Sequence, residues 1–129
     1  MPASPRSPFQ YAILRIVPRV ERGECLNTGV ILFARTLDYL GARVALDPRR
    51  LRALSPGTDP DPLLAQLDGL VRIAAGDPVE GPIARLPRHQ RFHWLVAPSS
   101  TVIQPSSVHT GLCDDPELML ERLHAQLVG

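Results

Sequence analysis

The sequence predicts an α+β fold, in which a small, mostly antiparallel sheet of three to four strands carries helices packed mainly on one face. Segments rich in β-branched and aromatic residues come first along the chain, and apolar residues at helical spacing follow them. With 129 residues, 44% of them hydrophobic, the chain can bury one substantial core. We therefore expect residues 1–8 to be a disordered Pro/Ser tail and residues 9–129 to form a single α+β domain.

The first three predicted strands follow one another closely. Residues 9–17 are rich in β-branched and aromatic side chains, and Pro18 ends the strand. Residues 29–35 are apolar on both faces, which indicates a strand in the middle of the sheet. Residues 41–46 form the third strand after a short turn. Because sequential strands with short connections usually pair, we expect three antiparallel neighbours.

Helices follow, and Asp-Pro pairs mark where they begin. An aspartate caps the free N–H groups of a first helical turn, and proline fits that turn. The pairs are Asp47-Pro48, Asp61-Pro62 and Asp115-Pro116. The second pair opens the clearest apolar stripe, which ends at Gly76, and the third opens a C-terminal helix. Residues 86–96 are expected to form a helix that ends before Pro98, and residues 99–104 a short edge strand.

Composition excludes several classes of partner. Fourteen basic and thirteen acidic residues give a formal charge of +1, which argues against nucleic acid, because phosphate-binding chains carry excess positive charge. The longest apolar run, residues 30–34, is too short to cross a membrane, and the start lacks a signal-peptide pattern. The cysteines, Cys25 and Cys113, form no CxxC motif. We therefore expect free thiols, no membrane association and a cytoplasmic location.

The loop of residues 19–29 concentrates charged residues and glycine before the predicted central strand, where functional residues often lie. In a functional interpretation Arg19 binds an anion, Glu24 does acid–base or cation-binding work, and Asn27 holds a fixed hydrogen bond. In a structural interpretation Asn27 satisfies backbone groups of the loop, and Glu24 accepts a hydrogen bond from Arg15 or from loop amides. The sequence leaves both interpretations open.

A second segment, residues 99–104, also lies at a predicted strand end and completes a candidate surface for a ligand or partner. The candidate residues are Arg15, Arg19, Glu24, Asn27, Ser100 and Gln104. If they converge in one pocket, a ligand-binding or enzymatic domain is favoured. If they scatter over a flat surface, an interaction module is favoured.

A metal site is not supported by the spacing of histidine and cysteine. His89 and His93 stand four apart, as two metal ligands on one helix face must. However, Gln90 stands where a metalloprotease needs glutamate, and no third ligand has standard spacing. We therefore expect no metal and no cofactor.

Two further groups of residues contain the side chains of a known kind of site but lack the rest of its pattern. A Ser/His/Asp group has the residue types of a hydrolase triad but lacks the GxSxG elbow. Its members are Ser106, Ser107, His109, Asp114 and Asp115. An arginine group lacks the interleaved aromatic residues on which the bases of single-stranded nucleic acid stack. It consists of Arg43, Arg49, Arg50 and Arg52.

Four short patterns together resemble the uncharacterised bacterial family known as domain of unknown function 3037. They are Tyr11-Ala-Ile-Leu-Arg15 with Pro18, Glu24-x-x-Asn27-x-Gly29-Val30, Pro98-x-Ser100-x-Val-Ile-Gln104, and Gly111-Leu112. The resemblance covers residues 11–128. It implies no established activity, and the frequent position of such genes beside those for HipA-like kinases implies a protein partner.

We therefore expect a non-enzymatic interaction or accessory module, a regulatory partner of a HipA-like kinase. The alternative is a small enzyme or anionic-ligand-binding domain that uses the loop 19–29 and the segment 99–104.

Overall fold

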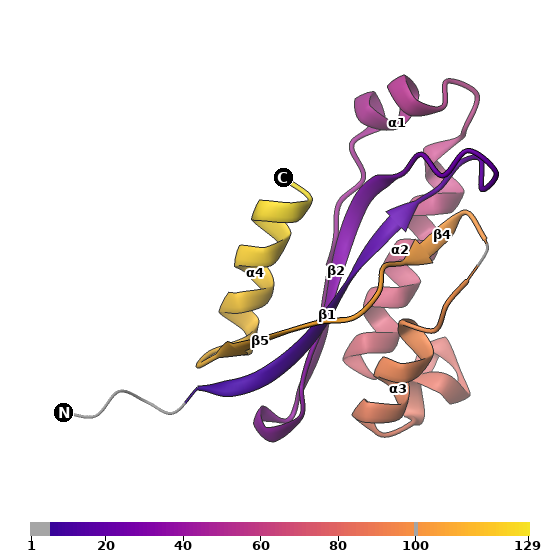
Figure 1. The fold of residues 1–129 in the computed structure, drawn as a ribbon. Helices are drawn as coiled ribbons and strands as arrows, with labels where there is room; N and C mark the ends of the chain where they lie inside the picture. Colours follow the sequence, from indigo (N-terminus) through magenta and orange to yellow (C-terminus); the bar gives the residue numbers. More distant parts are fainter. Residues whose placement is uncertain (1–5, 100) are drawn as a thin grey trace.

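The computed structural model of the protein describes residues 6–99 and 101–129 (Figure 1). Its centre is an antiparallel sheet in the order β3-β2-β1-β4, with a fifth strand, β5, also paired with β1. The strands are β1 (Ser7–Ile16), β2 (Leu26–Ala34), β3 (Tyr39–Val44), β4 (Ile103–Pro105) and β5 (His109–Cys113). The expected α+β class and the three antiparallel neighbours β1, β2 and β3 are confirmed.

β4 and β5 lie end to end along the same side of β1, so the sheet has one strand more than the three to four expected. Ser106 lies between them and keeps β1 paired. Its N–H donates to the Ile13 carbonyl oxygen at 2.8 Å, and its hydroxyl accepts from the Ile13 N–H at 2.8 Å. A side-chain oxygen thus replaces a main-chain acceptor where the pairing register shifts.

Of the described residues in the predicted strand 99–104, Ser99, Thr101 and Val102 lie outside any strand, and β4 begins only at Ile103. One main-chain bond continues the pairing beyond β4, because the Val17 N–H donates to the Val102 carbonyl oxygen at 2.7 Å. Side-chain bonds follow: the Ser99 hydroxyl accepts from the Thr101 N–H at 3.2 Å, and the Gln104 amide donates to the Thr101 carbonyl oxygen at 2.8 Å. Such local bonds compete with sheet pairing, so the strand is shorter than predicted.

The first strand begins before the predicted end of the tail. Ser7 pairs with Cys113 and Pro8 with Leu112, so the tail predicted for residues 1–8 extends two residues too far. Pro8 is tolerated because this end of β1 pairs with β5 alone, and an edge accepts a residue without an N–H. Residues 1–5 lie outside the described part.

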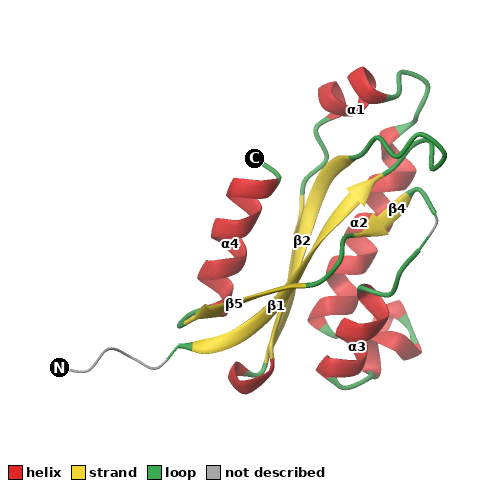
Figure 2. Ribbon diagram, viewed as in Figure 1, coloured by secondary structure: helices red, strands yellow, loops and turns green. Residues whose placement is uncertain are grey.

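Helices cover both faces of the sheet (Figure 2). They are α1 (Pro48–Leu54), α2 (Pro60–Ala75), α3 (Arg88–Leu95) and α4 (Pro116–Leu127), with short 3₁₀ turns at Arg35–Leu37, Pro78–Glu80 and Pro82–Arg85. The first three helices lie on one face and α4 on the other, which agrees with helices mainly on one face. No helix within residues 6–99 and 101–129 has the length and apolar character needed to cross a bilayer.

The predicted caps hold at two of the three helix starts. Asp47 accepts from the Arg49 N–H, and Asp115 accepts from the Leu118 N–H. α2 begins two residues before the predicted start, because a second Asp-Pro pair, Asp59-Pro60, stands directly before Asp61-Pro62. Asp59 is the cap, and it accepts from the N–H of Asp61 at 3.0 Å.

Two hydrophobic clusters explain why β2 is apolar on both faces. Ile31 and Phe33 point into the cluster under α1, α2 and α3, where Phe33 stacks on Phe92 with ring centres 5.1 Å apart. Val30 and Leu32 point into the cluster under α4. The fold therefore places β2 in the middle, as predicted, and β3 at one border of the sheet.

Candidate functional site

Three of the predicted site residues lie in one row across the sheet. Arg15 on β1 is the register partner of Asn27 on β2 and of Gln104 on β4. The Asn27 side-chain amide donates to the Leu127 carbonyl oxygen at 3.0 Å, so the row lies on the α4 face, at the C-terminal end of that helix. Asn27 therefore makes a structural contact, but with the end of α4 rather than with the backbone groups of its own loop.

Arg15 differs from its neighbours in the row. Its Nε is buried and has no hydrogen-bond partner among the described residues, whereas Gln104 donates to the Thr101 carbonyl. The end of α4 lies one strand away, at Asn27, and the carbonyl groups at a helix C-terminus favour a nearby positive charge. The guanidinium thus has an electrostatic reason to lie there.

Arg19 and Glu24 lie apart from this row, in the loop between β1 and β2. They line a cleft of about 310 Å³ together with Arg22 and the connection between α1 and α2. Glu24 forms an ion pair with Arg22, which corrects the predicted pairing with Arg15. The two side chains are 59% and 47% exposed, and such a pair contributes about 0–1 kcal/mol, less than a buried bond would.

The six predicted residues therefore do not share one pocket. Arg15, Asn27 and Gln104 belong to the sheet, Arg19 and Glu24 to the cleft, and Ser100 lies outside the described residues.

The residues of the Ser/His/Asp group and the two histidines of the predicted helix make separate contacts and do not form a common site. The Ser106 hydroxyl donates to the Ser107 carbonyl oxygen, the His109 ring lies 5.2 Å from the Tyr11 ring, and Asp115 caps α4. His89 and His93 are exposed on α3. Within the described part of the chain, no three His, Cys, Asp or Glu side chains lie close enough to hold a metal ion.

Both cysteines are free, with Cys25 exposed and Cys113 buried. Burial raises the pKa of the Cys113 thiol, and the charges of Asp114 and Asp115 raise it further. A thiol with a raised pKa is a poor nucleophile at neutral pH.

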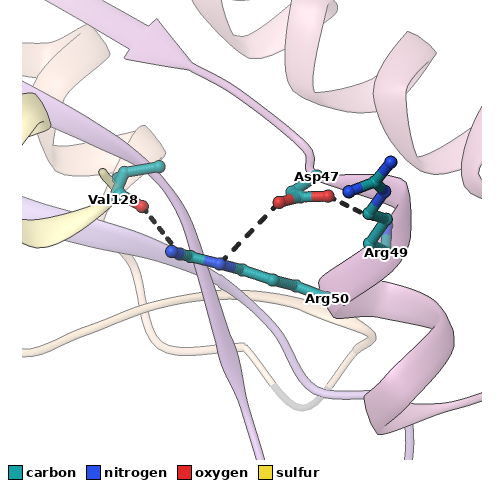
Figure 3. A network of polar contacts seen from close by, with 4 residues as sticks. All are labelled: Asp47, Arg49, Arg50 and Val128. Carbon is teal, nitrogen blue, oxygen red and sulfur yellow. Dashed lines mark hydrogen bonds and ion pairs between the residues drawn. The ribbon is translucent and has the colours of Figure 1, made fainter.

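Two members of the arginine group already have partners. Arg50 donates to the Val128 carbonyl oxygen at 3.0 Å and lies 3.8 Å from the Asp47 carboxylate, which links the start of α1 to the end of α4 (Figure 3). Arg43 lies 3.5 Å from Glu121. These contacts occupy Arg43 and Arg50, so fewer of the four arginines remain available to bind phosphate.

A different feature is a groove along the outer border of β3. Residues 39–43, consecutive in the strand, line a groove of about 300 Å³. One wall is formed by Val71 and Ala75 of α2, and the other by Glu117, Leu120 and Glu121 of α4. An edge strand thus forms the floor between two helices.

The phase of the ladder shows which main-chain groups of β3 face this groove. The Ala45 N–H donates to the Thr28 carbonyl oxygen at 2.8 Å, directly after the last register pair of β2 and β3. In an antiparallel ladder every second residue bonds to the neighbouring strand. Tyr39, Gly41 and Arg43 therefore bond to β2. The N–H and C=O groups of Leu40, Ala42 and Val44 point outward, away from β2, and Leu40 and Ala42 line the groove.

The opposite border of the sheet is less suited to pairing. Pro105 interrupts it, since proline has no N–H, and the register shift at Ser106 breaks it again. β3 has six residues, no proline and a continuous register with β2.

The residues of β3 predict a strand, but they do not indicate that it forms a free border of the sheet. Its outer border is free only because β4 and β5 pair with β1 rather than with β3. That choice depends on contacts between distant segments, and no local pattern in residues 39–44 reveals it.

Comparison with known proteins gives one result. The chain matches the model of a family described as "Protein of unknown function (DUF3037)" over residues 11–128. No curated protein and no solved structure matches it.

Proposed function

The chain belongs to the DUF3037 family, and from that premise we propose that it is a non-enzymatic protein-interaction module that binds an extended segment of a partner along β3. One observation carries the proposal: the outward main-chain groups of an edge strand face a groove between two helices. Such an edge pairs with an extended segment, which gains main-chain hydrogen bonds, and the walls supply specificity.

The position of the groove, beside β3 and between α2 and α4, allows a further strand to be added to the sheet. Neighbouring strands lie about 4.8 Å apart, so a segment beside β3 continues the sheet between α2 and α4. Leu40, Ala42 and Val44 offer the hydrogen-bonding groups it needs. No reacting group is required for this role.

Fewer observations support the alternative, a domain that binds an anionic ligand in the cleft at the β1–β2 loop. The cleft at the β1–β2 loop holds Arg19 and Arg22, but Glu24 already pairs with Arg22. Arg15, Asn27 and Gln104 do not line it.

Capture of partners by strand-edge variants tests the proposal. Ala42→Pro removes an N–H that points into the groove, so it blocks an added strand and spares the ladder with β2. Thr110→Pro is the matched control on β5. Ile13 bonds to Ser106, so the alternate residues of β1 that face β5 are Ile13, Tyr11 and Phe9. Gln10 faces the other way, and its register partner Thr110 therefore directs its N–H away from the sheet.

The tagged chain and both variants are to be purified from the native host, and the co-purifying proteins identified. A HipA-like kinase is the first candidate for direct mixing. We expect a stoichiometric partner with the parent and Thr110→Pro chains, and at least a tenfold loss with Ala42→Pro. An equal yield of that partner with Ala42→Pro contradicts the proposal.

A further inference from the structure

We propose that the segment bound along β3 alternates basic and small apolar side chains, the basic ones directed toward α4 and the apolar ones toward α2. This inference rests on the proposed function and adds the chemistry of the partner segment.

The alternation follows from the position of the groove. Successive side chains of a strand point to opposite faces of a sheet. β3 shows this: Leu40, Ala42 and Val44 pack against the cluster under α2, whereas Tyr39 packs against the cluster under α4. A strand added beside β3 meets the same two helices in alternation.

The α4 wall carries excess negative charge. Glu117 and Glu121 line it, and Arg43 is the one cation among the described lining residues. Arg43 already pairs with Glu121, which leaves Glu117 without an ion pair in the described part of the chain. Burial raises the pKa of Tyr39, and Glu117 is the next largest cause, as expected beside a negative wall. A partner side chain here is favoured when it is Lys or Arg.

The α2 wall has the opposite character. Val71 and Ala75 are its lining residues, and both are apolar. A charged partner side chain would lose water there without gaining a counter-charge, which costs free energy. The groove of about 300 Å³ also extends along five residues of β3, so small side chains fit best.

A second copy of the chain does not fit this groove. If two β3 strands paired, they would lie about 4.8 Å apart. Each would carry its own α2, which packs on β3, and helix axes need about 8–10 Å between them. A single extended segment brings no helix with it, so we assign the groove to another protein.

Two labelled seven-residue peptides serve as probes, one alternating Arg with Val and the other Glu with Val. Fluorescence anisotropy with the full chain is expected to show at least tenfold tighter binding of the basic peptide, weakened by Ala42→Pro and by added salt. Glu117→Arg is expected to reverse the preference. Glu21→Arg, an equal change in charge in the exposed β1–β2 loop, is expected to leave it unchanged.

Three results would overturn the inference: equal or absent binding of the two peptides, a preference unaffected by Glu117→Arg, or a concentration-dependent dimer in sedimentation that Ala42→Pro abolishes. The last would identify a second copy as the occupant. These failures are distinguishable from failure of the proposed function. If partner capture still depends on Ala42 while the peptides show no charge preference, only the chemistry of the segment is wrong.

Discussion

Ser106 shows how one side chain preserves a sheet at a register shift. The register between β1 and the segment that contains β4 and β5 shifts by one residue. Leu14 pairs with Pro105 on one side of the shift, and Tyr11 pairs with His109 on the other. The Ile13 N–H would have no acceptor there without the Ser106 hydroxyl, and both groups are buried. A buried donor without a partner costs free energy, so the serine stabilises β1 at this point.

Removing this hydroxyl should destabilise the protein measurably. Ser106→Ala leaves the Ile13 N–H unpaired, and we expect a loss of about 1–3 kcal/mol in the free energy of unfolding. Urea denaturation measures it. Ser107→Ala is the matched control, because Ser107 is exposed and accepts from Ser106 through its main chain. If both variants unfold at the same urea concentration as the parent, this role of Ser106 is wrong.

At the residue scale, the sequence indicates which polar side chains make specific contacts better than it indicates which groups they contact. Asn27 was expected to have a structural or functional role, and it holds the end of α4. Glu24 was expected to accept a hydrogen bond from Arg15 or from loop amides, but it pairs with Arg22, two positions away in the same loop. A long exposed side chain has several cations within reach, and the loop conformation decides among them.

At the scale of elements, the contact between α4 and β3 contains a histidine sensitive to pH. The Nδ1 of His124 is buried and has no hydrogen-bond partner among the described residues. Burial lowers the pKa of His124 below its ordinary value of 6.5 and the nearby Arg43 guanidinium lowers it further, while the Arg43 main chain offsets part of this decrease. Arg43 also pairs with Glu121 on the same helix.

Stability should therefore decrease in mild acid. In the unfolded chain His124 takes up a proton near pH 6.5, whereas in the folded chain it resists protonation until lower pH. The unfolded state then binds more protons, so the stabilisation present above pH 6.5 is lost as the pH falls toward the folded pKa. Urea denaturation at pH 7.5 and 5.5 should show a smaller decrease for His124→Gln than for the parent.

His93→Gln removes an exposed histidine and should keep the parent's pH dependence. The account of His124 fails if His124→Gln loses as much stability between the two pH values as the parent does.

Some elements were predictable and others were not. Asp-Pro caps and apolar stripes are local signals, and they predicted α1, α2 and α4 to within a few residues. β5 was missed because it is largely exposed and contains Gly111, a residue typical of turns. In the structure that glycine makes room for an aromatic ring: a Cβ at residue 111 would lie 2.6 Å from Cζ of Phe9.

At the scale of the whole molecule, the order of the strands creates the proposed binding surface. The β4 and β5 segments, distant in the sequence, pair with β1 and leave β3 at the other border, between α2 and α4. The α+β class followed from local patterns, but this border depends on pairings between segments far apart in the chain. The interaction surface is therefore a property of the topology.

Amide hydrogen exchange of β3, followed by NMR with and without the captured partner, tests this central claim most directly. In the free chain the amides of Tyr39, Gly41 and Arg43 should exchange slowly, and those of Ala42 and Val44 quickly, because only the first group bonds to β2. Addition of the partner should slow Ala42 and Val44 at least tenfold and leave Thr110 on β5 unchanged. Partner binding that protects other amides while Ala42 and Val44 exchange as before would contradict the account.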